Sequence, residues 1–348
     1  MPSLIGTDLQ TAVQKNCHIS DARHAGDYTL CIYLLKMREY FRWENGYKFN
    51  DTLPQDKVGN WLKEREQLWN GLEKENFTQV PINGDFFDPF DTDAINQTLI
   101  PQGLVYSGGF GQKFKPHFFL GKLQRQELHG DYTVLICADE YARDLTSPPA
   151  MTLGQSVFIR RESIRRMIWE RVEEWRWNRL DNAMGRAIAC YDFDADLDRA
   201  LEQMTDKELE TVLDHEIGEV LAGQHLGPEW EELLSTLPRS KAEIIARAVR
   251  DHLADALSTL PRLLERADNA ALHSYVANLN GMRKELCPSL KRAYTHWVKT
   301  GDQDNLRSCA ADGRTHWLSV AEAMLQLHRK YGARITPYLE ELVEESRL

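Results

Sequence analysis

The chain has 348 residues, 42% hydrophobic and 27% charged, a composition typical of ordinary globular proteins and not of disordered or coiled-coil chains. Its formal net charge of −11 argues against nucleic-acid binding, because domains that bind nucleic acids are usually basic. No stretch approaches about 18 consecutive apolar residues, and the first residues lack the features of a signal peptide. We therefore expect no membrane span and a cytoplasmic location.

The N-terminal segment, residues 1–77, is predicted to be helical. A helical pattern over 20–43 gathers apolar residues on one face, from which Asp27 and Arg38 also project. A second amphipathic pattern covers 58–74. Because buried polar groups need partners, Asp27 and Arg38 either tie this helix to the rest of the protein or line a polar pocket. We expect the segment to pack on a C-terminal bundle.

Residues 78–150 are predicted to form a small β-rich module, because Gly, Pro, Asp and aromatic residues replace the helical pattern there. The turn His129-Gly-Asp131 joins two strand-like runs, and this arrangement predicts a β-hairpin. The following stretch, 146–155, is rich in Pro and small residues. It is expected to be a linker or an active-site loop.

Residues 151–348 are predicted to form a C-terminal helical bundle, whose longest helix runs over 162–191. Arg176 and Arg179 are among the arginines on the apolar face of this helix. Such arginines either pair with buried carboxylates or receive an anionic ligand through bidentate contacts. In the second case, Arg176 and Arg179 would steer the charge of a substrate.

The helix pair over 205–264 is where chemistry is expected. Thr205-Asp-Lys-Glu208 and Ser240-Lys-Ala-Glu243 both have the capping-box pattern, in which side chains satisfy the free backbone donors at a helix start. Each therefore predicts the first turn of a helix. Two helices joined by a short connection usually pack antiparallel, so their facing sides would form one seam.

Polar groups lie on this seam where apolar side chains are expected. Glu216 falls inside the apolar arc of the first helix, with His215 and Glu219 beside it. His252 lies in the middle of the second apolar face, and Asp255 lies at its edge. Carboxylates and imidazoles on facing helices suit Fe, Mn or Zn, and bridging carboxylates suit a di-iron or di-manganese centre. These five residues are the predicted metal ligands, and Glu216 is also a candidate catalytic residue.

No established signature identifies a cofactor. The stretch His215-Glu-Ile-Gly-Glu219 departs from H-E-x-x-H, and neither Glu-x-x-His nor a His-Asp dipeptide occurs. Ser107-Gly-Gly-Phe-Gly111 lacks the ending of a phosphate loop and the G-x-G-x-x-G spacing, so no nucleotide cofactor is expected. The six cysteines are too scattered for a zinc finger or a redox motif, and a G-x-S-x-G nucleophile elbow is also absent.

The sequence thus predicts a mainly α protein, a helical bundle with a small inserted β-rich module that contains a hairpin. The leading functional hypothesis is a cytoplasmic metal-dependent enzyme, with oxidative chemistry included, that acts on a small anionic substrate. Metal-free acid–base catalysis by Glu216, with its pKa raised by burial, is a second hypothesis.

The competing class is a non-catalytic interaction or assembly protein, in which the His, Glu and Arg cluster is a structural hydrogen-bonding network. Nine tryptophans suit such a protein, with a homo-oligomer or another protein as the partner. Exposure of Trp175, Arg176 and Trp177 over a wholly buried cluster would favour this class. A cleft that reaches Glu216 would favour the enzyme.

Overall fold

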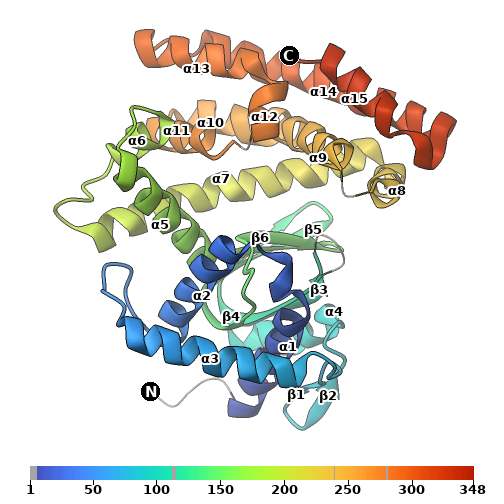
Figure 1. Ribbon diagram of the computed structural model, residues 1–348. Helices are drawn as coiled ribbons and strands as arrows, with labels where there is room; N and C mark the ends of the chain where they lie inside the picture. Colours follow the sequence, from blue (N-terminus) through green and yellow to red (C-terminus); the bar gives the residue numbers. More distant parts are fainter. Residues whose placement is uncertain (1–5, 112–114, 239, 280) are drawn as a thin grey trace. The chain divides into compact units, whose positions relative to one another are not determined.

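The computed structural model describes residues 6–111, 115–238, 240–279 and 281–348. The chain forms two compact units, Met1–Glu170 and Arg171–Leu348, which we call unit 1 and unit 2 (Figure 1). No helix in the described part of the chain is both long enough and apolar enough to cross a membrane.

A curled, mixed sheet of five strands lies at the centre of unit 1. Its strands are β3 (Leu104–Phe110), β4 (Pro116–His129), β5 (Tyr132–Arg143), β6 (Ala150–Leu153) and β7 (Ser156–Arg160). They lie in the order β3-β4-β5-β7-β6, and neighbours are antiparallel except β5 and β7, which run parallel. A separate ribbon pairs β1 (Val80–Ile82) with β2 (Asp85–Phe87).

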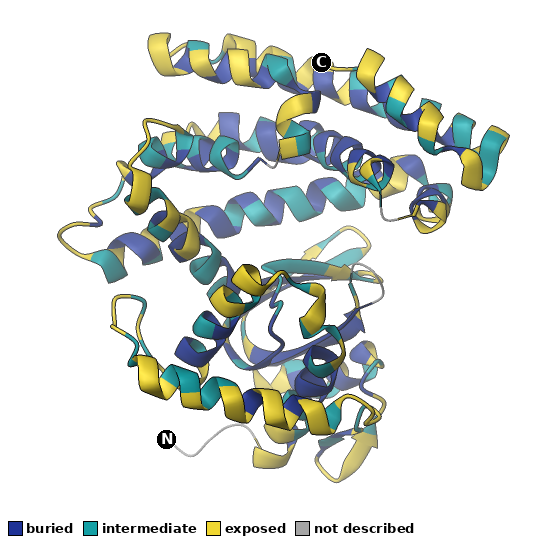
Figure 2. Cartoon of the chain, viewed as in Figure 1, coloured by how far each residue is buried: buried dark blue, intermediate teal, exposed yellow. Residues whose placement is uncertain are grey.

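The hairpin predicted at His129-Gly-Asp131 is confirmed as the connection between β4 and β5. His129 pairs with Tyr132, and Gly130 adopts a φ of +59°, which a residue without a Cβ tolerates best. The first half of β4 and the middle of β5 are buried without alternation (Figure 2). Strands covered on both faces have continuous apolar runs, so their sequence shows no period of two.

Unit 1 also contains helices, some of which lie on the sheet while others pack on those helices. They are α1 (Thr7–His24), α2 (Leu30–Glu44), α3 (Gln55–Leu72), α4 (Thr92–Leu99) and the first part of α5 (Arg161–Asn178), with the turns η1 (Ala25–Asp27) and η2 (Ile100–Gln102). The helix α1 lies directly on β4, where the Cys17 thiol and the Ser20 hydroxyl donate hydrogen bonds to backbone carbonyls of that strand. The predicted helix over 20–43 is wrong in one respect, since η1 separates α1 from α2.

Unit 2 is helical in its described residues. Its elements are α6 (Ala183–Ile188), α7 (Leu197–Leu226), α8 (Pro228–Thr236), α9 (Lys241–Ala254), the π-helical turn η4 (Asp255–Thr259), α10 (Leu260–Arg266), α11 (Asn269–Asn278), α12 (Gly281–Leu286), α13 (Pro288–Thr300), α14 (Asp304–Tyr331), η5 (Gly332–Arg334) and α15 (Thr336–Glu345). One apolar core joins them, and the indoles of Trp230 and Trp317 are buried in it.

Two predicted helix boundaries of this region are wrong. The long helix expected over 162–191 ends at Asn178, because the next residue, Arg179, has a φ of +45°. The helix expected to start at Thr205 starts at Leu197, where the Asp196 carboxylate caps the backbone N–H of Arg199 at 3.0 Å. The Thr205 hydroxyl lies inside this helix and donates to the carbonyl of Leu201 at 2.7 Å.

The predicted fold class, a mainly α helical bundle with a small β-rich insert, is wrong. The protein is 66% helical, but unit 1 is organised around the five-stranded sheet. The prediction failed because β6 falls in the stretch expected to be a linker or loop, and β7 falls in the range expected to begin the C-terminal helical bundle. β7 pairs with β6, its neighbour in sequence, and also in parallel with β5, so it joins both strands to one sheet. The division into 1–77, 78–150 and 151–348 stays a prediction.

Candidate metal centre

The helices α7 and α9 of unit 2 run antiparallel and approach closely at Gly218. A Cβ built on Gly218 would lie closer to the carbonyl oxygen of Ala254 than real Cβ atoms come. Glycine is thus required here by the close approach of another backbone, while its own φ is ordinary. This contact brings the two helices so close that side chains within one turn of Gly218 on α7 lie opposite side chains within one turn of Ala254 on α9.

Replacing Gly218 by Ala is expected to destabilise unit 2 by roughly 1–3 kcal/mol, because the helices must separate to admit a methyl group. Gly223→Ala is the matched control, since a Cβ there meets nothing and Ala favours a helix by about 1 kcal/mol. Urea unfolding followed by circular dichroism measures both. Equal stability of Gly218→Ala and the wild type would contradict this account of the seam.

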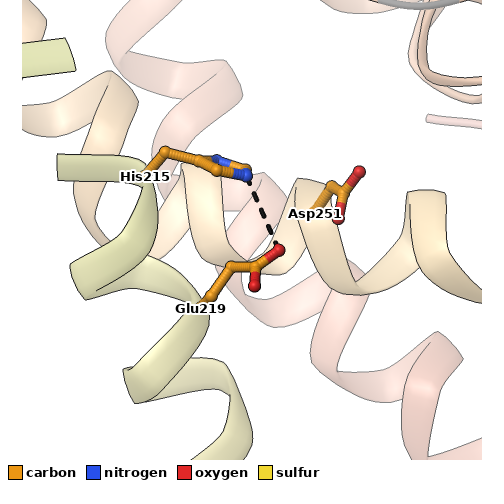
Figure 3. A group of neighbouring side chains, drawn as sticks. All are labelled: His215, Glu219 and Asp251. Carbon is orange, nitrogen blue, oxygen red and sulfur yellow. Dashed lines mark ion pairs between the residues drawn. The ribbon is translucent and has the colours of Figure 1, made fainter. Parts of the chain in front are cut away.

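Three ligand-type side chains gather on the seam beside this contact. His215 and Glu219 come from α7, one turn apart, and Asp251 comes from α9. One potential ligand atom from each lies within 4.8 Å of the other two, and Figure 3 shows the three side chains converging. His215 Nε2 and Glu219 Oε1 are 3.7 Å apart. All three residues are half-buried, so solvent reaches the group.

Asp255 fixes the orientation of the His215 ring from the side opposite this group. Its Oδ1 lies 2.8 Å from His215 Nδ1. The hydroxyls of Thr259 and Tyr275 donate to the same carboxylate at 3.0 and 2.8 Å, and the guanidinium of Arg283 pairs with it. A carboxylate with these donors is an acceptor, so His215 donates its Nδ1–H to it. In a neutral ring, Nε2 then carries a lone pair that faces Glu219 and Asp251.

The π-helical turn η4 begins at Asp255 and interrupts an otherwise continuous helix from α9 into α10. Such turns insert one extra residue and are frequent at functional sites. In this helix, the insertion starts at the residue that holds His215. The local distortion is therefore part of how the group is positioned.

Cationic groups border the carboxylates. Arg250 Nη2 donates to Glu219 Oε2 at 3.0 Å, which leaves Oε1 directed toward His215. Burial alone would raise the pKa of Glu219, but Arg250 and His215 bring it below its ordinary value. Burial raises the pKa of Asp251 despite the nearby Arg283, and Asp251 accepts no side-chain hydrogen bond within the described part of the chain.

This donor set fits a first-row divalent cation. Imidazole and carboxylate ligands are those used by Zn, Mn and Fe sites. Ligand atoms lie about 2.1 Å from such an ion, so two of them in a tetrahedral arrangement are about 3.4 Å apart. Side-chain movements of about 1 Å would bring the observed group to that spacing. A carboxylate on the distal nitrogen, as Asp255 provides for His215, is the usual support of a metal-binding histidine.

Of the five predicted ligands, the structure brings His215 and Glu219 into this group and places Asp255 behind His215. Glu216 is half-buried on the same helix and is outside the group. His252 is buried, stacks on Trp317 with ring centroids 4.7 Å apart, and donates from Nε2 to the carbonyl of Arg283 at 2.9 Å.

Burial lowers the pKa of His252 to about 3, so its ring is neutral at physiological pH. Its stacking and its hydrogen bond to a backbone carbonyl give this histidine a structural role in the core. The two predicted substrate-steering residues lie elsewhere on the chain, with Arg176 half-buried in α5 and Arg179 exposed just after it. No described contact joins either arginine to His215, Glu219 or Asp251.

Asp251 is the candidate ligand that sequence reasoning missed. The helical pattern favoured its neighbour His252, because His252 lies in the centre of the apolar face. The usable signal was the spacing of Asp251 and Asp255, which are four residues apart and therefore project from the same side of a helix. The spacing of His215 and Glu219 on α7 is identical.

A second polar cluster, in unit 1, was also missed. His117 Nδ1 lies 2.8 Å from Asp144 Oδ2, and both side chains are buried. Asp21 is wholly buried nearby, where it accepts the backbone N–H of Leu145, and Lys115 Nζ lies 3.9 Å from its Oδ1. The sequence feature that could have indicated it is a polar residue at the end of each apolar strand run, His117 and Asp144. The hairpin of β4 and β5 brings these two ends side by side.

The two aspartates of this cluster titrate in opposite directions. Burial, followed by the charge of Asp144, raises the pKa of Asp21 to about 8. Burial also acts to raise the pKa of Asp144, but His117, Arg160 and Lys115 hold it below its ordinary value. At neutral pH, Asp144 is thus the ionised member of the pair and Asp21 is mainly protonated.

Comparison with known families matches both parts of the chain. Residues 8–160 match the N-terminal domain, and residues 165–346 the C-terminal domain, of a family of unknown function, DUF6866. Comparisons with curated proteins and with solved structures found no match. Because the two matches together span most of its length, the chain belongs to the DUF6866 family.

Proposed function

We propose that the protein is a metal-dependent enzyme whose divalent cation binds to His215, Glu219 and Asp251. The orientation of His215 carries this proposal, because Asp255 holds Nδ1 and leaves Nε2 facing two carboxylates. A nitrogen lone pair and two carboxylates that face one another repel, whereas a cation between them is attracted to all three.

Three protein ligands support a single cation and leave coordination positions open for water or substrate. The bound ion would supply Lewis-acid polarisation of a substrate oxygen or of a water molecule. The chain's own residues prepare the site: Asp255 selects the His215 tautomer, and Arg250 neutralises the outer oxygen of Glu219. A small anionic substrate, steered by Arg176 and Arg179, stays a prediction.

A metal-free interpretation predicts different measurements. If His215 is an imidazolium, its Nδ1–H donates to Asp255 and its charge pairs with Glu219 at 3.7 Å, and the ion pairs with Arg250 and Arg283 complete a structural network. Such a network would bind no transition metal. The carboxylate of Asp251 favours the metal, because it faces His215 and Glu219 without a side-chain hydrogen bond to a described residue, although Arg283 is near enough to attract it.

Asp251→Asn separates these interpretations. The substitution keeps the shape of the side chain but replaces the negatively charged carboxylate, the proposed metal ligand, with a neutral amide. We expect wild-type protein to bind about one equivalent of Zn²⁺ or Mn²⁺ in equilibrium dialysis. The variant should bind at least tenfold more weakly, since one anionic ligand is lost. The metal should also raise the melting temperature of the wild type more than that of the variant.

Glu285→Gln, on the exposed face of α12, is the matched control and should bind metal like the wild type. Equal affinity of Asp251→Asn and Glu285→Gln, or no binding by the wild type, would exclude the proposed centre. Catalysis is tested separately, by turnover of small anionic esters that requires the added metal and is lost in Asp251→Asn. Metal binding without turnover of any substrate would leave a metal site but contradict an enzyme of this class.

The competing proposal, a non-catalytic interaction protein, is supported by an aromatic surface in unit 2. Trp177 is 87% exposed, and Leu180 is 58% exposed beside a cavity of about 220 Å³ that Trp175 helps to line. His215 and Glu219 retain side-chain exposures of 24% and 22%, so the cluster is not wholly buried as the structural network would require. The metal-binding measurement therefore decides between the two classes.

A further inference from the structure

Three side chains from separate elements of unit 1 meet through a chain of hydrogen bonds. Tyr28, between η1 and α2, has its hydroxyl 2.7 Å from Thr146 Oγ1 in the connection between β5 and β6. Lys115, just before β4, donates from Nζ to the same oxygen at 2.8 Å. Its ammonium also lies 5.5 Å from the centre of the Tyr28 ring. Lys115 is largely buried, so its charge is held at a defined place.

Two further cations complete this group. Lys36, on α2, places its ammonium 5.3 Å from the centre of the same Tyr28 ring and donates no hydrogen bond to a described residue. Arg166, on α5, donates to the carbonyl of Ser147 at 2.7 Å and is therefore anchored next to Thr146. Two ammonium groups thus lie at the Tyr28 ring, and a guanidinium is anchored at Ser147, the residue after Thr146.

Carboxylates in the neighbourhood balance these charges only in part. Asp144, which is ionised at neutral pH, attracts Lys36 and Lys115, but it also attracts His117 and Arg160. The carboxylate nearest Lys115 is Asp21 at 3.9 Å, and burial raises the pKa of Asp21 to about 8, so it is mainly neutral at pH 7. Glu170 Oε1 lies 3.7 Å from Arg166 Nε and also attracts Lys36. Burial is the main cause that lowers the pKa of Lys36, and Arg143 and Lys115 lower it further. The group therefore has an excess of positive charge in a partly desolvated place.

We propose that Lys36, Lys115 and Arg166 bind a phosphate group beside Tyr28 and Thr146. Cations that converge from separate elements surround a tetrahedral dianion, whereas a planar carboxylate is better matched by one guanidinium fork. Lysine ammonium groups act as point charges on phosphate, and of the two hydroxyls, which share one hydrogen bond, the one that accepts it can donate to a phosphate oxygen. This site is in unit 1 and is independent of the proposed metal centre.

The phosphate group has two plausible chemical sources, a free phosphate compound and a lipid headgroup. A lipid headgroup is one of the two because the first turns of α2, between Tyr28 and Lys36, are largely exposed (Figure 2) and contain large apolar residues. These are Leu30, Ile32, Leu34 and Leu35, with exposures of 70%, 47%, 45% and 56%. Apolar side chains beside basic ones are typical of surfaces that meet anionic lipid.

The first test uses inorganic phosphate with the full chain. Phosphate should raise the melting temperature in a saturable manner at constant ionic strength, and it should protect Lys36 and Lys115 from acetylation by acetic anhydride, as read by mass spectrometry. Lys36→Gln should weaken phosphate binding at least about tenfold, since one charged hydrogen-bond donor is lost. Lys63→Gln, an exposed lysine on α3, is the matched control and should bind like the wild type.

Two results would overturn the proposal. One is an equal rise in melting temperature with phosphate in Lys36→Gln and Lys63→Gln, which would show that phosphate stabilises the protein only as a general salt. The other is acetylation of Lys36 and Lys115 at rates that neither phosphate nor a phosphate-bearing vesicle changes. The acetylation measurement does not depend on any variant folding, so the proposal stays open to refutation if Lys36→Gln is unstable.

Vesicles distinguish the two sources. Sedimentation with phosphatidic acid vesicles, but not with neutral phosphatidylcholine vesicles, and its loss in Lys36→Gln would support the lipid phosphate. Saturable stabilisation by inorganic phosphate without sedimentation would support the free compound. Absence of both would contradict a phosphate site. Because metal plays no part in these measurements, their failure would leave the proposed function untouched.

Discussion

Asp21→Asn is expected to remove a large fall in the stability of unit 1 that the wild type shows between about pH 4 and pH 8. Burial and the charge of Asp144 raise the pKa of Asp21 from 3.8 to about 8 in the folded protein. Between these values the folded state holds one more proton than the unfolded state, so the free energy of unfolding falls as pH rises. The contribution is complete below about pH 4 and lost above about pH 8. At 1.36 kcal/mol for each pH unit, the fall amounts to roughly 5 kcal/mol.

Hydrogen exchange of peptides from β4 and β5 across this pH range would measure the effect within unit 1. Asparagine retains an acceptor for the backbone N–H of Leu145, so Asp21→Asn changes mainly the titration. Asp131→Asn, in the exposed turn of the hairpin, is the control and should follow the wild-type profile. Parallel profiles for the wild type and Asp21→Asn would show that this carboxyl is not the group that titrates.

Glu140→Gln should destabilise unit 1 by roughly 3–5 kcal/mol, because it leaves a buried arginine without its counter-charge. Arg160 is wholly buried, and its Nε donates to Glu140 Oε1 at 2.9 Å. Within the described residues, neither Nη atom of Arg160 has a hydrogen-bond partner. The Glu140 carboxylate also accepts from Ser163 at 2.6 Å and from Ser147 at 3.1 Å. Although burial acts to raise the pKa of Glu140, Arg160 and Arg143 bring it below its ordinary value.

Glu127→Gln is the matched control, because Glu127 forms an ion pair with Arg125 on the solvent-exposed part of β4 and should cost less than about 1 kcal/mol. Guanidinium chloride unfolding at pH 7 would compare the two variants. The double variant Glu140→Gln with Arg160→Met should recover much of the loss, since both buried charges are then removed. A loss below about 1 kcal/mol in Glu140→Gln alone would mean that solvent or another group reaches Arg160.

Part of the candidate metal centre could be predicted from the sequence. The spacing of His215 and Glu219 places both on one side of any helix through them, and the polar groups stood out within an apolar pattern. The partner from α9 could not be predicted in the same way. Successive residues of a helix point about 100° apart, so a small rotation decides whether Asp251 or His252 faces α7. That rotation depends on the contact of Gly218 with Ala254 and on the π-helical turn at Asp255.

The sequence by itself determined the features that depend on neighbours along the chain. These are the hairpin at His129-Gly-Asp131, most helical segments, and the shared side of His215 and Glu219 on α7. They are local because a turn or a helical face needs only the conformations of a few consecutive residues. Apolar and polar residues do not alternate in the buried parts of β4 and β5, because strands covered on both faces are uniformly apolar. The extent of the sheet could therefore not be predicted from a period of two.

Only the tertiary structure decided the features that join distant segments. The parallel pairing of β5 with β7 joins the predicted β-rich module to residues that were predicted to begin the C-terminal helical bundle. Asp21 and Asp144 acquire opposite titration only when α1 lies on the strands, and Lys36 and Lys115 meet over Tyr28 only in the folded unit. Burial and Coulomb interactions depend on distances through space, which the order of residues along the chain does not specify.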